Sequence, residues 1–471
     1  MTAGVVVGAG PNGLAAAVAL ARAGVAVTVL ESHDTIGGGT RTEELTVPGV
    51  RHDVCSAMHP LAVGSPFLQT LDLGRHGLEW CWPEIDLAHP LDTGTAGVLE
   101  RSVDNTAAGL GRDGAAWRRL FEAHAKRFDD LGADILRPVA HVPRHPLLLA
   151  SFGLRALAPA SWIAHRWHED ETRALFGGMA AHAFRPLTSP TSASVGLALG
   201  LSAHRYGWPV ARGGSSAITD ALAAELRAHG GRIETGRHVS SLNEVDGADV
   251  VLLDLSPRGV LDLAGDRLPA RIARAYRRYR FGPAAYKVDL AVEGGVPWTN
   301  AECRRAGTVH VGGTFDEVAA AEADVAAGRM PERPFMLVGQ QYLADPSRSV
   351  GNVHPIWIYA HVPHGYTGDA TEAVLRQLER FAPGVLERIV GQAVRGPMDY
   401  AKYNPNFVGG DISTGANDPV QVLLRPRVAI DPYRTGIPGV YICSAATPPG
   451  GGVHGMCGAN AAASALRHLA R

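Results

Sequence analysis

Three parts of the chain share a pattern in which a short apolar run stands beside a glycine turn and an alanine-rich stretch. At the start, residues 4–7 form an apolar run that fits a buried parallel strand. Residues 14–23 are rich in alanine and predict a helix that Gly24 ends. Residues 25–30 predict a second buried strand, so residues 4–31 form a strand–helix–strand unit.

The same pattern returns twice further along the chain. Within residues 205–262, paired glycines precede a predicted helix over 217–228, and a predicted strand follows over 248–253. Residues 439–443 predict another strand, which a glycine-rich turn connects to a predicted helix over 460–469. We interpret these parts as one discontinuous nucleotide-binding domain, assembled from the segments 1–75, 205–280 and 425–471.

Two long segments of different texture separate these parts. Residues 76–204 are rich in His, Pro, Trp and Leu and contain a predicted helix over 113–131. Residues 281–424 contain alternating strands, for example 285–291 and 354–360. Together the segments 76–204 and 281–424 predict an α+β substrate-binding domain that is interleaved with the first domain. The predicted fold class is therefore α/β, with two discontinuous domains.

Composition excludes several classes of protein. The chain has 471 residues, a net charge of −2 and 46% hydrophobic residues, which describes a globular protein with no reason to bind nucleic acid. Its five cysteines include no C-x-x-C pair, which argues against a disulfide framework, a zinc site or a redox-active dithiol, and favours a reducing compartment; we expect no metal site. The first strand begins by residue 4 and no run of about 18 apolar residues occurs, so we expect a cytoplasmic protein without a leader or membrane span.

The turn after the first strand reads Gly-Ala-Gly-Pro-Asn-Gly over residues 8–13 and predicts a dinucleotide-binding site. Gly8 allows a sharp turn, Gly10 lets the backbone approach a pyrophosphate, and Gly13 lets the helix pack close to the sheet. Pro11 and Asn12 lie between them, at the helix N-terminus where the phosphates bind. Glu31 ends the second strand and fits the acid that accepts the ribose hydroxyls. These features predict a Rossmann-like domain.

A second glycine loop distinguishes between NAD and FAD. Gly37, Gly38 and Gly39 follow Glu31 closely, and Arg41 comes directly behind them. A nicotinamide-binding domain has no use for such a loop, whereas the longer flavin dinucleotide needs additional backbone donors and a cation. The sequence therefore predicts FAD, with Arg41 as the cation that faces the phosphates.

The glycine loops, residues 208–214 and residues 439–458 resemble the phytoene desaturase-related FAD-dependent oxidoreductases from end to end. The chain is most similar to the branch of pyridine nucleotide-disulfide oxidoreductase domain proteins. The resemblance implies FAD, a fold shared with amine oxidases, and a substrate domain built over the flavin ring. One departure is Gly39, where many relatives carry arginine.

The resemblance also implies further cofactor contacts. Val239 matches the position that contacts adenine, and the turn containing Gly451, Gly452 and Val453 matches the segment beside the flavin ring. Met456 would begin a helix whose N-terminus faces the ring's pyrimidine edge, where negative charge develops on reduction.

Three histidines are candidates for proton transfer or substrate binding. His59 follows the second glycine loop, His182 lies in a glycine-containing helical stretch, and His454 lies within the C-terminal turn. A neutral imidazole near pH 7 accepts a proton, which suits a general base. A structural hydrogen-bonding role fits each of the three as well.

Residues 146–164 form the longest apolar region, which fits a substrate tunnel, a contact with a membrane surface or the core of the substrate domain. The sequence predicts a dehydrogenase or desaturase that transfers hydride from an apolar or aromatic small molecule to the flavin, with peripheral membrane contact as a further feature. It leaves open an amine or alcohol oxidase, a redox-neutral isomerase, and a flavin-stabilised binding protein without turnover. Oxygen or a quinone as electron acceptor, the substrate's identity, the mode of FAD attachment and the oligomeric state stay open too.

Overall fold

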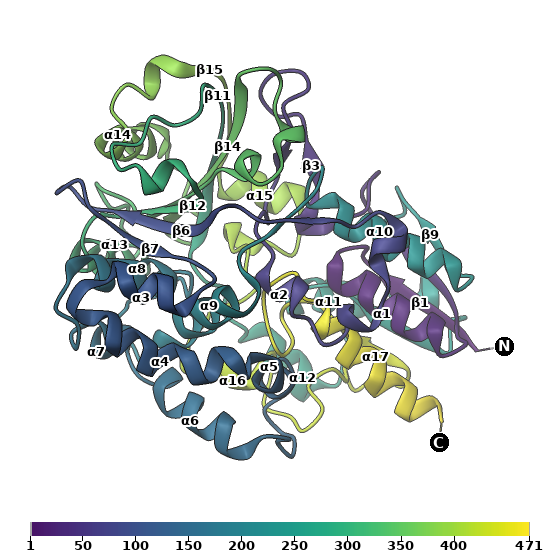
Figure 1. The fold of residues 1–471 in the computed structure, drawn as a ribbon. Helices are drawn as coiled ribbons and strands as arrows, with labels where there is room; N and C mark the ends of the chain where they lie inside the picture. Colours follow the sequence, from purple (N-terminus) through teal and green to yellow (C-terminus); the bar gives the residue numbers. More distant parts are fainter. Residues whose placement is uncertain (1, 471) are drawn as a thin grey trace.

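Two separate β-sheets, each covered by its own helices, form the computed structural model (Figure 1). The structure describes residues 2–470. The first sheet is entirely parallel, with the strand order β16-β10-β1-β2-β9. Its strands are β1 (Ala3–Val7), β2 (Ala26–Leu30), β9 (Arg232–Glu234), β10 (Val250–Leu253) and β16 (Val440–Ile442).

Burial on both faces explains why these strands are continuous apolar runs. On one face, Val6, Val29 and Leu252 pack with α1 (Pro11–Arg22), α10 (Ser216–Ala228) and α17 (Met456–Leu469). On the other face, Val7 and Leu253 pack with α11 (Pro257–Ala264) and α12 (Ala270–Arg277). Because all five strands are parallel, their carboxyl ends lie along one edge of the sheet, which is where ligands bind in folds of this type.

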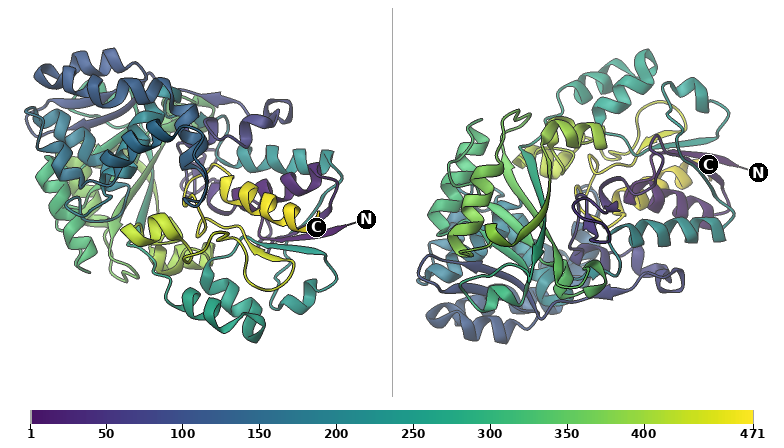
Figure 2. Two further views of the ribbon diagram at one scale, coloured as in Figure 1. Left: turned by 90° about the horizontal axis from the view of Figure 1, so that it is seen from below. Right: turned by 90° about the horizontal axis from the view of Figure 1, so that it is seen from above.

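The second sheet has seven strands in the order β15-β11-β14-β13-β12-β6-β7 and lies beside the first (Figure 2). All neighbours are antiparallel except β6 and β12, which are parallel. The strands are β6 (Ile85–Pro90), β7 (Ala96–Leu99), β11 (Ala284–Glu293), β12 (Ala306–Val311), β13 (Met336–Gly339), β14 (Val353–Val362) and β15 (Ile389–Arg395).

Helices cover this second sheet on both faces. One face packs against α8 (Asp170–Ala181), α9 (Ala193–Tyr206) and α13 (Phe315–Ala326), and the other packs against α14 (Thr371–Phe381). The remaining helices are α2 (Pro60–Val63), α3 (Val103–Gly109), α4 (Gly114–Lys126), α5 (Phe128–Ile135), α6 (Pro146–Ala156), α7 (Ala160–Ala164), α15 (Pro397–Tyr403) and α16 (Pro419–Leu424). Two short strand pairs complete the fold, β3 (Thr42–Glu43) with β4 (His52–Asp53), and β5 (Trp80–Cys81) with β8 (Val210–Ala211).

The predicted α/β class is confirmed, and the bounds of one predicted helix were wrong. The helix expected over 113–131 is two helices, α4 and α5, because the backbone leaves the helical conformation at Arg127 (φ −117°, ψ 24°). The domain boundary predicted between residues 204 and 205 falls inside α9, which continues to Tyr206. Gly207 ends that helix with a positive φ of 73°.

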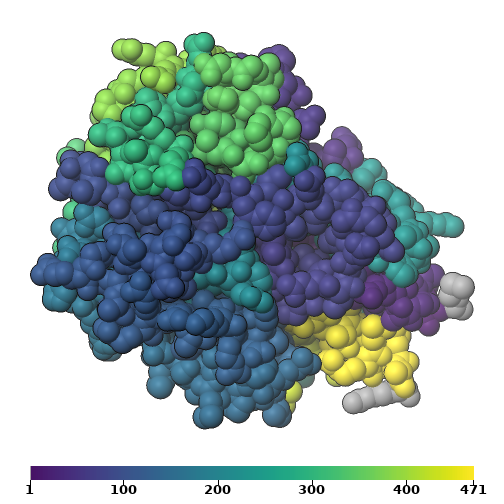
Figure 3. All heavy atoms as spheres, viewed as in Figure 1, coloured from purple at the N-terminus to yellow at the C-terminus, as the bar shows by residue number. Residues whose placement is uncertain are grey.

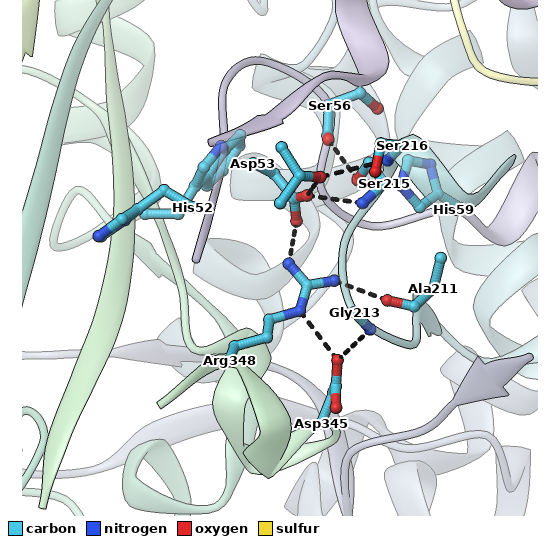
Figure 4. Close-up of polar contacts among 12 residues, drawn as sticks. His52, Asp53, Ser56, His59, Ala211, Gly213, Ser215, Ser216, Asp345 and Arg348 are labelled. Atoms are coloured by element: carbon cyan, nitrogen blue, oxygen red, sulfur yellow. Dashed lines mark hydrogen bonds and ion pairs between the residues drawn. The ribbon is translucent and has the colours of Figure 1, made fainter. Parts of the chain in front are cut away.

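A buried ion network connects the two sheets (Figure 4). Arg348, in the connection between β13 and β14, lies between the carboxylates of Asp53 and Asp345 and is completely buried. Its Nη2 donates to the Ala211 carbonyl (2.8 Å). Asp53 accepts from the backbone N–H of Ser215 (2.7 Å), one residue before α10 begins. The Arg348 guanidinium therefore links the β13–β14 connection of the second sheet to the segment that precedes α10. Helix α10 in turn packs against the first sheet.

We expect Arg348→Met to lower the free energy of unfolding by about 3–5 kcal/mol, because it leaves two buried carboxylates without their counterion. Urea unfolding followed by circular dichroism measures the change. Arg329→Met is the matched control, since Arg329 makes an exposed pair with Asp324 and its loss costs about 1 kcal/mol or less. Equal effects of the two substitutions would contradict the role given to the network.

Candidate functional site

A single cavity of about 970 Å³ extends from the carboxyl edge of the first sheet to the inner face of the second. This volume lies at the upper end of the range for small-molecule and cofactor sites. One end is lined by Gly8, Gly10 and Glu31, and the other by Trp357 and Tyr359. The cavity therefore has room for both a dinucleotide at one end and a second molecule at the other.

The turn between β1 and α1 is shaped by its glycines. Gly8 has a φ of +104°, which a residue with a side chain rarely adopts. A Cβ on Gly13 would lie 2.1 Å from the carbonyl oxygen of Gly8, so only glycine lets α1 start this close to the strand. Pro11 and Asn12 line the cavity at the first turn of α1, and Gly13 lies directly behind them. The backbone has the form that the sequence motif predicts for a pyrophosphate cradle.

Glu31 lies at the carboxyl end of β2 and faces the cavity while being 7% exposed. Its Oε2 accepts the N–H of Ala9 (2.7 Å), and its Oε1 accepts the N–H of His33 (2.9 Å). The Ser32 hydroxyl also donates to Oε1 (3.5 Å), so these bonds fix the carboxylate in place, and Oε2 keeps a further lone pair for a ribose hydroxyl.

The second glycine loop packs directly onto the first. Gly37 N–H donates to the Ala9 carbonyl (2.9 Å), and a Cβ on Gly38 would lie 3.0 Å from the Cα of Gly10. Gly38, Gly39 and Arg41 line the cavity, whereas Gly37 lies behind them. The two loops thus form one continuous wall of backbone around the cofactor end.

Arg41 is 5% exposed and much of its hydrogen-bonding capacity is used within this loop. Its guanidinium donates to the carbonyls of Thr35 (2.7 Å) and Gly38 (3.3 Å) and lies 3.7 Å from Glu31. The arginine braces the loop and at the same time places positive charge at the cavity wall, where the predicted phosphates would lie.

The C-terminal turn forms part of the cavity wall. Gly451, Gly452 and Val453 line the cavity, as does Val239 from the opposite segment. Met456 begins α17 as expected, but it does not line the cavity, and its N–H donates to Nδ1 of His454 (3.0 Å). The Met456 N–H at the start of α17 is therefore already bonded to the His454 side chain from the preceding glycine-rich turn.

Two of the three candidate histidines have structural partners outside the cavity wall. His59 is 2% exposed and its Nε2 is 2.8 Å from the Ser215 hydroxyl. His454 is 1% exposed and caps α17 through the Met456 bond. Burial lowers the pKa of each ring to about 4, so both are neutral at pH 7. Their geometry supports the structural role that the sequence also allowed.

His182 is the candidate that lines the cavity. Its Nε2 is 3.0 Å from Nε2 of His310, on β12. Burial lowers the pKa of His182 to about 3 and also lowers that of His310, so both rings are neutral and one must donate to the other. This arrangement leaves Nδ1 as the nitrogen of His182 available to a ligand. Sequence reasoning missed His310, although it lies two residues after the cavity-lining Thr308 on an alternating strand.

Large apolar and aromatic side chains form the end of the cavity beneath the second sheet. They come from the loop before α2, from the segments after α8 and α9, and from β13 and β14: Met58, Phe184, Trp208, Leu337, Trp357 and Tyr359. Such a chamber binds an apolar or aromatic molecule by burying its surface.

A second functional candidate that the sequence reasoning missed is Asp254. It follows β10 directly, lines the cavity, and accepts the N–H of Gly13 at 3.0 Å. Burial, with a contribution from the nearby Glu31, raises its pKa to about 7. The signal was present in the sequence, since Asp254 follows a buried apolar strand just as Glu31 does.

Neither a metal site nor a membrane-spanning helix is found in the part of the chain that the structure describes. Within it, no group of three or more His, Cys, Asp and Glu side chains is arranged to hold a metal ion. Residues 2–470 also contain no helix that combines the length and the hydropathy needed to cross a bilayer.

Comparison with known proteins connects this site to a group of oxidoreductases. Residues 6–68 match the model of an NAD(P)-binding Rossmann-like domain. The chain is 26% identical to pyridine nucleotide-disulfide oxidoreductase domain-containing protein 2 of Rattus norvegicus, over 99% of this chain and 93% of that protein. It is also 26% identical to phytoene dehydrogenase of Streptomyces griseus, over 95% of this chain and 92% of that protein. The solved structure of putrescine oxidase bound to putrescine superposes with a TM-score of 0.61 at 18% identity, covering 100% of this chain and 99% of the other.

The chain resembles these oxidoreductases over its whole length. The predicted resemblance to phytoene desaturase-related oxidoreductases is therefore confirmed, and with it the prediction of an oxidoreductase that uses FAD. The residues of the cofactor end fit that group, because the backbone cradle, the fixed Glu31 carboxylate and the second glycine loop all face one cavity.

We expect Gly13→Ala to lower the flavin content of the purified protein strongly, because the added methyl would displace α1 from the Gly8 carbonyl and distort the cradle. The ratio of visible flavin absorbance to protein absorbance measures the effect. Gly132→Ala in α5 is the matched control, since a methyl added there would meet no neighbouring atom within 4 Å. Full flavin content in the Gly13 variant would contradict the placement of the cofactor.

Proposed function

We propose that the protein is an FAD-dependent dehydrogenase or desaturase that removes hydride from a largely apolar small molecule. The observation that supports this best is the continuity of the cavity, because the dinucleotide cradle, the C-terminal turn and the aromatic chamber all line it. An oxidoreductase needs this arrangement, because the reacting part of the substrate must lie against the redox-active ring.

Different residues of the cavity wall are assigned to different parts of the cofactor. The first turn of α1 and the second glycine loop hold the pyrophosphate, Glu31 binds the adenosine ribose, and Val239 contacts the adenine. When bound, FAD supplies the hydride acceptor at its N5 atom. The turn at Gly451, Gly452 and Val453 lets the backbone lie close to the ring, since two of these residues have no side chain.

His182 is the residue that we assign to proton transfer. Its ring lies in the wall of the cavity, and its bond to His310 fixes the ring's orientation. In the tautomer whose Nε2–H donates to His310, Nδ1 of the neutral ring carries the lone pair and accepts a substrate proton or a substrate hydroxyl hydrogen. The aromatic walls around it exclude water, which strengthens each of these polar contacts.

Helices α6, α7 and α16 carry large exposed apolar side chains. Leu147, Leu154 and Trp162 on α6 and α7 are 86%, 79% and 67% exposed. Val420 on α16 is 59% exposed, while Val422 of the same helix lines the cavity. Exposed apolar side chains of this size mark an interaction surface. We name the surface formed by Leu147, Leu154, Trp162 and Val420 the apolar rim.

Hydrogen bonds join the two parts of the apolar rim beside the cavity. Arg185 donates to Thr191 Oγ1 (3.2 Å) and to the Asn417 carbonyl (2.6 Å), and Thr191 N–H donates to the carbonyl of Leu157, at the end of α6. Asn417 lines the cavity and lies two residues before α16. The exposed Arg144 and Arg166 flank the apolar stretch. This combination fits a cytoplasmic protein whose apolar rim rests on an anionic membrane surface; α6 and α7 are labelled at the lower left of Figure 1, and the same part of the chain forms the blue surface at the lower left of Figure 3.

We expect the purified protein to carry FAD, and an apolar substrate to bleach its visible absorbance anaerobically. His182→Ala should slow that reduction by about 10²–10⁴-fold, the usual contribution of a general base, without loss of flavin. Stopped-flow absorbance measures the rate, with the exposed His468→Ala as control.

The same assay separates the alternatives. Peroxide release with amines or alcohols favours an oxidase, and turnover only after chemical reduction of the flavin favours an isomerase. A colourless protein that binds no FAD, or flavin that no hydrocarbon, amine or alcohol reduces, would contradict the proposed enzyme.

Replacement of Leu154 and Trp162 by serine should abolish flotation of the protein with vesicles that contain anionic lipid, because both apolar anchors are lost. Flotation on a density gradient compares the variant with the unmodified protein. Val390→Ser, at an exposed position of β15, should float normally. Failure of the unmodified protein to float would contradict the membrane contact.

A further inference from the structure

Asp254 lies at the point where the cofactor's phosphates are expected. Its backbone N–H donates to the Val7 carbonyl (2.8 Å), which places it beside the end of β1. Its Oδ2 accepts the N–H of Gly13 (3.0 Å), and a Cβ on Gly10 would lie 2.9 Å from the same oxygen. The carboxyl group therefore occupies the mouth of the cradle, in the space that the glycines leave open.

The Asp254 carboxyl group accepts one of the few backbone N–H groups that the first turn of α1 could offer to a phosphate. Pro11, at the first position of α1, has no N–H. The N–H of Leu14 already donates to the Gly10 carbonyl (2.9 Å). In the first turn this leaves the N–H groups of Asn12 and Gly13, and Asp254 uses the second. A phosphate at this helix N-terminus must therefore interact with Asp254 as well as with the backbone.

The cations Arg41, Arg237, Lys402 and Arg425 also line this cavity, but the charged side chain that shifts the pKa of Asp254 is an acid. Glu31, at the end of β2, is another carboxylate, and Arg41 is 3.7 Å from Glu31 and bonded to its own loop. From β16 and α17 the titratable neighbours are the buried thiols of Cys443 and Cys457, whose pKa values are raised by burial. An ionised Asp254 and a pyrophosphate would thus repel each other strongly, because the site is shielded from water.

We propose that Asp254 is a cofactor-binding residue that accommodates the pyrophosphate only as the neutral carboxylic acid, with its O–H donated to a phosphate oxygen, so that FAD binding takes up one proton. The inference rests on the proposed function, since it assumes that FAD is the ligand of this cradle. It goes beyond that function, because it makes cofactor occupancy depend on pH.

The sign of the dependence follows from the two protonation states. Burial raises the pKa of Asp254 to about 7 without a ligand, and the added phosphate charge raises it further. The complex therefore holds more protons than the empty protein, so affinity is highest at low pH. Above pH 7 the dissociation constant should rise by about tenfold per pH unit, until the pKa of the complex is reached.

The test is a titration of cofactor-stripped full-length protein with FAD from pH 6 to pH 9, followed by flavin fluorescence. The unmodified protein should show the rise in dissociation constant. Asp254→Asn, which keeps a hydrogen-bond donor and removes the charge, should bind FAD equally at all of these pH values. The exposed Asp266→Asn is the matched control and should behave like the unmodified protein.

Calorimetry in two buffers of different ionisation enthalpy provides a measurement that needs no variant. At pH 8 the unmodified protein should take up about one proton per FAD bound, within the limits of a single titrating group. Tight binding without proton uptake, or a parallel loss of affinity with pH in Asp254→Asn, would overturn this inference and leave the proposed function intact. Absence of FAD binding at every pH would overturn both.

Discussion

At the start of α1, two helices and a strand meet without side chains between them. A Cβ on Gly13 would lie 2.1 Å from the Gly8 carbonyl oxygen, and a Cβ on Gly458 of α17 would lie 1.8 Å from the carbonyl oxygen of Asn12. This close packing fixes both helices against the carboxyl edge of the first sheet. The cradle, the C-terminal turn and the fixed Glu31 carboxylate all take their positions from it, because each belongs to an element that touches α1 or its strand.

The second constraint is the contact between the two sheets. Three of the six side chains of the aromatic chamber lie on β13 and β14 of the second sheet, while the cradle belongs to the first, so the cavity has its shape only when the sheets hold one orientation. Arg348 secures that orientation with a charge that is completely buried between Asp53 and Asp345. A buried ion pair adds little stability compared with a packed apolar core, but its strict geometry suits the positioning of two domains.

Features that depend on residues close together in the sequence could be predicted, whereas contacts that depend on the order of strands in the sheets could not. The strand–helix–strand unit over residues 4–31, its glycines and Glu31 were found because each feature lies within a few residues of the next. Asp254 approaches Gly13 only because β10 pairs with β1, and His310 reaches His182 only because β12 lies beneath α8. Likewise, the structural partner of His59 is Ser215, far away in the sequence. No local pattern predicts such pairs, although an acidic residue after a buried strand is a usable signal.

The order of strands in the first sheet has a consequence for biosynthesis. β10 pairs on one side with β1 and on the other with β16, and β16 is made almost 200 residues after β10. Until residues 440–442 leave the ribosome, the Val-Val-Leu-Leu strand presents an unpaired apolar edge, the kind of surface on which chains associate wrongly. A nascent chain of this protein therefore carries an unpaired strand edge while the residues between β10 and β16 are translated, and it needs protection during that interval, by a chaperone or by early cofactor contacts.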